Sequence, residues 1–128
     1  MLTKQAYYHA LSQLNSTKGK KEEVLSKSNT LNSCEGQLEG LRSRILQNHS
    51  TLQSDCTILP ANWRGDTSHK FSSYNLISIE KAKNGYINQI DAAIREINSA
   101  LTSMHSQLSS FDSTINQLEK ALRGGYIK

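Results

Sequence analysis

The chain has 128 residues, which is enough for one domain, and a net charge of +4 that is spread over both halves. Only 36% of the residues are apolar and 6% aromatic, which is few for the core of a compact globular domain. Without a continuous basic stripe or an apolar run near the roughly 20 residues that span a bilayer, neither nucleic-acid binding nor a stable membrane span is expected.

The first predicted element is a helix over about residues 4–59. Its apolar seam repeats every seven residues, at Val24, Leu31, Leu38, Ile45 and Leu52. A companion seam is predicted three positions after each member of this series. It contains Cys34 and Leu41, followed by the polar residues Asn48 and Asp55. Gly19 lies in the polar stretch 15–21 and costs about 1 kcal/mol relative to Ala, so fraying or a kink is expected there.

A turn is predicted over residues 60–65. Pro60 disfavours helix at the residue before it, and Asp66 can cap the free amides of a following helix. Such a short connection makes the two helices antiparallel, with residues opposite each other when their numbers add up to about 126. Trp63 can plug the end of the seam between the helices, and Gly65 permits a tight turn.

The second predicted helix, over about residues 66–123, carries the clearest pattern in the chain. Two apolar series, each with a seven-residue period, form the a and d positions of five heptads. They are Ile87, Ile94, Leu101, Leu108, Ile115 and Leu122, and Ile90, Ile97, Met104, Phe111 and Leu118. Gly124-Gly125 supplies the end of the helix.

The sequence therefore predicts a single all-α domain over residues 1–128, a coiled-coil-like antiparallel two-helix hairpin. In the predicted register the polar stretch 15–21 lies opposite residues 105–111 and cannot cover them. Leaving large apolar side chains exposed is costly, at about 1.5–3 kcal/mol each. We therefore expect a predicted partner surface, which packs against the helices of a partner and is made of Leu101, Met104, Leu108, Phe111 and Ile115. The same residues serve equally well as the hairpin's own core.

No catalytic constellation, metal set or cofactor motif is found. The four histidines lack the i, i+4 spacing of a metalloprotease helix. The predicted hairpin is expected to bring His69 near Cys56, but the sequence offers no third ligand or orienting group for them. The two cysteines, Cys34 and Cys56, are roughly 33 Å apart on one continuous helix, so they are expected to be free thiols. The prediction is a protein without enzymatic activity.

In its hairpin architecture and its Trp63-x-Gly65 turn, the chain resembles the WXG superfamily of bacterial type VII secretion. Its length and its arms rich in Ser, Asn and Gln look like the YwqH-like branch of Gram-positive bacteria, which includes helical partners of LXG-type toxins. One motif departs from the family. Tyr86 is followed at the fourth position by Ile90, with Asp91 one place late, so the Tyr-x-x-x-Asp/Glu export signal is missing there. Tyr126 is followed by too few residues to supply it.

The resemblance implies a non-enzymatic partner, chaperone or co-secreted accessory of an effector. It implies a homodimer, or a heterodimer with a related hairpin, that completes a four-helix bundle. It also implies contact with the N-terminal helices of a secreted toxin. The protein would be cytoplasmic before export and then secreted or held at the cell surface, with a partner providing the signal. The alternative is a coiled-coil scaffold, such as a phage or filament component, in which Trp63 is incidental. A membrane-active helical toxin is a third reading, which the Ser-rich arms disfavour.

Overall fold

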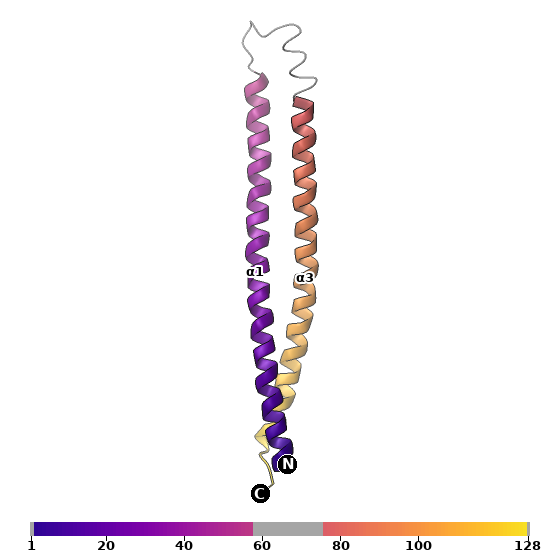
Figure 1. The fold of residues 1–128 in the computed structure, drawn as a ribbon. Coiled ribbons are helices and arrows are strands. Elements are labelled where there is room, and N and C mark those ends of the chain that lie inside the picture. Colours follow the sequence, from indigo (N-terminus) through magenta and orange to yellow (C-terminus); the bar gives the residue numbers. More distant parts are fainter. Residues whose placement is uncertain (1, 58–75, 128) are drawn as a thin grey trace. The chain divides into compact units, whose positions relative to one another are not determined.

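The computed structural model describes residues 2–57 and 76–127, and within them it contains two long helices (Figure 1). Helix α1 covers Lys4–Thr57 and helix α3 covers Ile77–Arg123. They pack against each other, so the predicted all-α hairpin is confirmed. The predicted turn at 60–65, with Trp63 and Gly65, lies outside the described residues, as do the predicted helix ends at residues 59 and 66.

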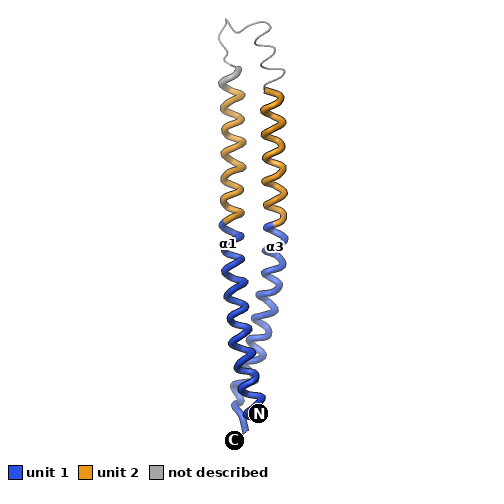
Figure 2. Tube along the Cα trace, viewed as in Figure 1, with its two compact units in different colours: residues 1–33, 97–128 blue, residues 34–96 orange. Residues whose placement is uncertain are grey.

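The chain divides into two compact units, and each contains a stretch of both helices (Figure 2). Unit 1 comprises residues 1–33 and 97–128, and unit 2 comprises residues 34–96. Within unit 1, Lys18 contacts Glu119 while Lys21 contacts Asp112, so the partner number falls as the α1 number rises. The helices of this unit are therefore antiparallel.

Helix α1 begins with a capping residue. The Oγ1 of Thr3 accepts a hydrogen bond from the backbone N–H of Ala6 at 3.1 Å, which satisfies an amide that the helix itself leaves unpaired. From Lys4 the helix is continuous to Thr57, and the fraying expected near Gly19 is not observed. Ion pairs of Lys18 and Lys21 with α3 hold the helix on both sides of Gly19, which offsets the low helix propensity of glycine.

Helix α3 carries charges that suit its dipole. Glu80 lies in its first turn, and Lys120 and Arg123 lie in its last turn. After Arg123 the chain leaves the helix at the predicted Gly124-Gly125 pair. Gly125 adopts φ +68°, and its N–H donates to the carbonyl of Leu122 at 3.0 Å. This left-handed conformation at a helix end favours glycine, which has no Cβ to clash.

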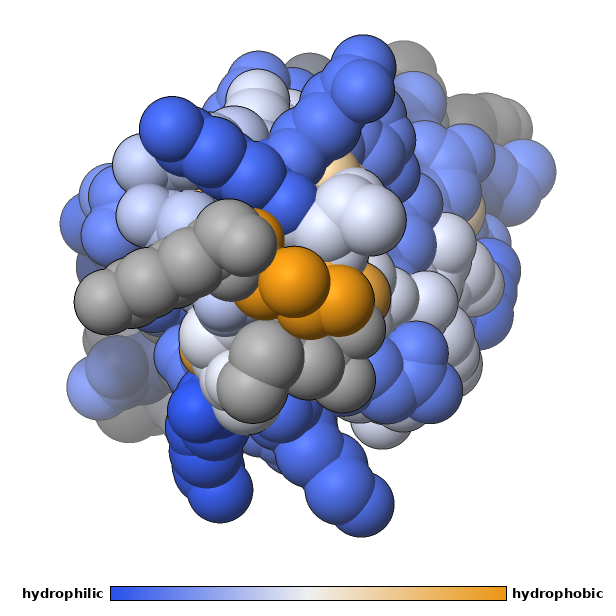
Figure 3. Space-filling view, turned by 90° about the horizontal axis from the view of Figure 1, so that it is seen from below, coloured by the Kyte–Doolittle hydropathy of each residue, from blue (hydrophilic) through white to orange (hydrophobic). Residues whose placement is uncertain are grey.

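The two chain ends meet in unit 1. Leu2 forms a parallel β-bridge with Tyr126, in which the Ile127 N–H donates to the Leu2 carbonyl at 2.8 Å. The ring of Tyr126 lies 5.0 Å from that of Tyr7 and 5.9 Å from that of Tyr8. Figure 3 views the molecule from this end and shows a small apolar patch surrounded by hydrophilic side chains. The sequence offered no signal for this terminal clasp, which depends on a contact between residues more than a hundred positions apart.

The predicted seam of α3 faces α1. Ile87, Ile90, Leu101 and Ile115 are buried, and the remaining seam residues of both series are half-buried. From α1 only Ala10 and Leu14 join the buried apolar core of the described residues. Two helices alone cover one side of each other, so most seam side chains keep some contact with solvent.

The face that α1 turns toward α3 differs from our prediction. The series from Val24 to Leu52 lies in the seam as expected, but its companion positions Cys34 and Leu41 are exposed. The companion positions found in the seam are polar: Lys21, Ser28, Glu35, Arg42 and His49. On a helix, the residues three and four positions after a seam residue both lie close to the same face. The set three positions on contains more apolar residues, but the set four positions on lies in the seam. Two members of this polar set, Lys21 and Arg42, form ion pairs with acidic residues of α3.

Candidate functional site

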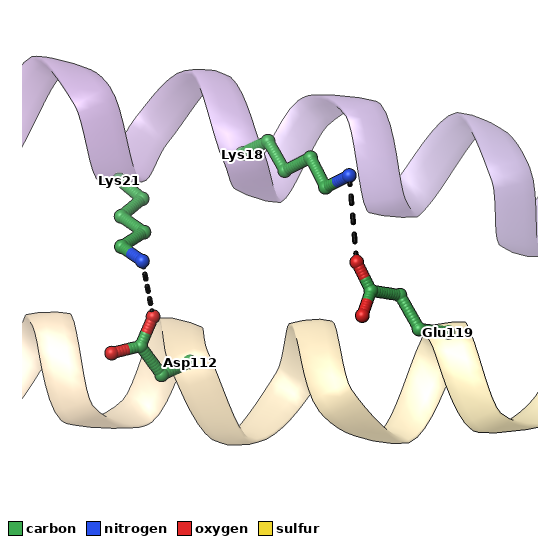
Figure 4. Close-up of polar contacts among 4 residues, drawn as sticks. All are labelled: Lys18, Lys21, Asp112 and Glu119. Atoms are coloured by element: carbon green, nitrogen blue, oxygen red, sulfur yellow. Dashed lines mark ion pairs between the residues drawn. The ribbon is translucent and has the colours of Figure 1, made fainter.

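An ion-paired flank links the two helices of unit 1 (Figure 4). The Nζ of Lys21 lies 2.5 Å from Oδ1 of Asp112, and the Nζ of Lys18 lies 3.5 Å from Oε1 of Glu119. These four side chains are between 34% and 52% exposed, so each pair contributes less than about 1 kcal/mol. Their value lies in selecting one alignment of the helices.

Unit 2 has an ion pair of the same kind. The Nε of Arg42 donates a hydrogen bond to Oδ1 of Asp91 at 2.8 Å, and both side chains are partly buried. Lys21 and Arg42 are three heptads apart in α1, and Asp91 and Asp112 are three heptads apart in α3. This matched spacing of bases and acids was the sequence signal for the register, and we missed it.

The observed contacts correct the predicted register. Our prediction placed residue 105 opposite Lys21 and residue 84 opposite Arg42, whereas the structure pairs them with Asp112 and Asp91. Both differences equal one heptad. A shift of seven residues returns the same apolar positions to the seam, so the heptad pattern is compatible with either register. The ion pairs distinguish between them.

The correction changes the surroundings of the predicted partner surface. Leu101 and Ile115 are buried between the helices of unit 1, while Met104, Leu108 and Phe111 are half-buried. The polar stretch 15–21 lies near residues 112–119 rather than near residues 105–111. The predicted mismatch between residues 15–21 and 105–111 is therefore wrong. The remaining exposure of the half-buried side chains comes from the open sides of a two-helix seam.

Shallow grooves run beside the seam in both units. In unit 1, Met104 lines a mostly apolar groove together with Leu31, Thr30, Ser26 and Lys27. A second groove in this unit is more polar and is lined on α1 by Ser12, Gln13, Ser16, Thr17 and Lys20, and on α3 by Thr114 and Leu118.

Unit 2 has a mostly apolar groove whose walls include the exposed side chains of Ile79 and Tyr86. The groove, of about 290 Å³, lies between α1 and α3. The lining residues are Ile45, Asn48, His49, Leu52, Ile79, Ala82, Lys83 and Tyr86. Open apolar grooves between helices are the usual receptors for another amphipathic helix.

The remaining chemically reactive groups are few. Cys34 is an exposed free thiol, while His69 and the side chain of Cys56 lie outside the described part. Within residues 2–57 and 76–127, no group of three or more His, Cys, Asp or Glu side chains could hold a metal ion. A hydrogen bond with Tyr8, together with that phenol's charge, raises the pKa of Tyr126 above its ordinary value.

Neither of the two described helices has an apolar stretch long enough to cross a membrane.

The chain was also compared with known protein families, curated proteins and solved structures. No family model, no curated protein and no solved structure matches this chain.

Proposed function

We propose that the protein is a non-enzymatic helix-binding hairpin that acts as the partner, chaperone or co-secreted accessory of an effector in a type VII-like secretion system. One observation carries the helix-binding part. The seam of α3 is apolar at every heptad from Ile87 to Leu122. The α1 seam that it faces is polar at every second position over residues 21–52. Met104, Leu108 and Phe111 are only half-buried in this seam. Helices of a partner would bury them in a four-helix arrangement.

The secretion part of the proposal rests on the WXG-like architecture. Two helices of similar length, 54 and 47 residues, flank the segment that contains Trp63 and Gly65. The proposed partner is a related hairpin, a second copy or the N-terminal helices of an LXG-type toxin. In this proposal the protein folds in the cytoplasm and leaves the cell with its partner.

The decisive experiment is co-expression with the N-terminal helices of an LXG-type toxin encoded in the same genome. We expect a stable complex that survives size-exclusion chromatography. The double variant Met104→Asp, Phe111→Asp should not form this complex, because burying two unpaired carboxylates at the interface is strongly unfavourable. Leu25→Asp is the control, since Leu25 is an exposed apolar residue of unit 1 that lines neither groove described there. Circular dichroism checks that all variants keep their helices.

The coiled-coil scaffold is the second candidate, and the repeating α3 seam favours it to the same degree. A scaffold would assemble with itself into large particles and ignore the toxin helices. Light scattering of the chain alone separates the two. Self-assembly without toxin binding would contradict the secretion proposal.

A further inference from the structure

The two flanks of unit 2 differ in chemistry. On one flank Arg42 and Asp91 form the ion pair that joins the helices. The other flank contains the groove of about 290 Å³, whose lining includes no carboxylate. Asp91 of α3 is thus engaged by α1, while the groove is left open and apolar.

The groove has the size and spacing that suit side chains of a helix. Its volume is just below the roughly 300–1,000 Å³ of pockets that enclose small ligands. Ile79, Ala82 and Tyr86 follow one another at i, i+3 and i+7 along its α3 wall, the spacing by which one helix docks on another. Ile79 is 37% exposed and Tyr86 is 60% exposed, so an occupant would bury substantial apolar area.

The charge of the groove indicates the kind of occupant. Lys83 is the one permanently charged residue of its lining, and among the described residues it forms no ion pair. Each of the two grooves of unit 1 is also lined by a lysine, Lys20 or Lys27, and by no carboxylate, although Lys27 forms an ion pair with Glu23. A second copy docked by the same face would bring such lysine-lined surfaces together, which is electrostatically unfavourable.

We propose that the groove of unit 2 binds an amphipathic helix of another protein, whose apolar residues at i, i+3 or i+4, and i+7 are flanked by carboxylates. The apolar residues enter between Leu52 of α1 and Ile79 and Tyr86 of α3, and a carboxylate pairs with Lys83. This inference rests on the proposed helix-binding function and adds the location of the site and the charge of the partner. It does not depend on export.

Two synthetic helical peptides test the proposal with the full chain. They share one leucine stripe, and their flanking positions are all Glu in one and all Lys in the other. By fluorescence anisotropy we expect the Glu peptide to bind roughly tenfold more tightly. Lys83→Glu should reverse that preference. A Glu peptide that binds no better than its Lys twin overturns the proposal.

A matched pair of substitutions locates the site. Ile79→Ser should weaken binding of the Glu peptide roughly tenfold, and Tyr86→Ser should do at least the same. Leu46→Ser should leave binding unchanged, since Leu46 is also 37% exposed but does not line the groove. Equal losses for Ile79→Ser and Leu46→Ser would mean that the peptide binds elsewhere. Helicity of each variant is checked by circular dichroism, and Lys83→Glu is informative even if a serine variant unfolds.

Three results separate this proposal from the others. If the chain alone is a dimer that Tyr86→Ser dissociates, the occupant is a second copy and the proposal is wrong. If the toxin complex fails to form while the Glu peptide still binds, the secretion assignment fails and the groove proposal stands. If the toxin complex forms but both Tyr86→Ser and Lys83→Glu leave peptide binding intact, the groove proposal fails alone.

Discussion

At the scale of single residues, two glycines differ in whether their backbone conformation tolerates a side chain. Gly19 is inside α1, where an added Cβ would meet nothing within 4 Å, while Gly125 has φ +68° after α3. We predict that Gly19→Ala raises the free energy of unfolding by about 0.5–1 kcal/mol and that Gly125→Ala lowers it by about 1 kcal/mol. Urea denaturation measures both. A neutral Gly19→Ala would mean that α1 is frayed at this point.

The terminal clasp contains one tyrosine with a shifted pKa, Tyr126. Its hydrogen bond with Tyr8 holds the Tyr126 pKa above the unfolded value, so the neutral phenol is favoured in the folded state. The stabilisation is present below the ordinary tyrosine pKa of about 10 and is lost as the pH rises through the higher folded pKa. We predict that Tyr8→Phe lowers the Tyr126 pKa in a spectrophotometric tyrosinate titration. Tyr86→Phe, far from the clasp in sequence, is the control and should leave it unchanged.

At the scale of the helices, the register of unit 1 is open to direct measurement. The ion pairs place residue 113 near the level of Lys20, whereas the register first predicted from the sequence places residue 106 there. These two positions differ by about 10 Å along α3. With Cys34→Ser and Cys56→Ser as background, we predict a shorter spin-label distance for positions 20 and 113 than for 20 and 106. The reverse order would restore the earlier register.

At the scale of the molecule, the two units bury different amounts of α1. Ala10, Leu14 and Ser28 are buried in unit 1, but no α1 residue among 34–54 is buried in unit 2. Fewer buried contacts lower the free energy of local opening. We predict that amides of 34–54 exchange with deuterium before those of 4–33, and that the Glu peptide slows them. Equal exchange along α1 would contradict this difference between the units.

The sequence by itself determined the helical class and the seam of α3, because five apolar heptads in one helix are a local pattern that needs no knowledge of the partner helix. It did not determine which companion positions of α1 face inward, or which of two registers one heptad apart is adopted. Those depend on Lys21 meeting Asp112, on Arg42 meeting Asp91, and on Leu2 pairing with Tyr126. Only the tertiary structure decided them, because a seven-residue repeat looks the same after a seven-residue shift, and charges distant in sequence must meet in space to break that equivalence.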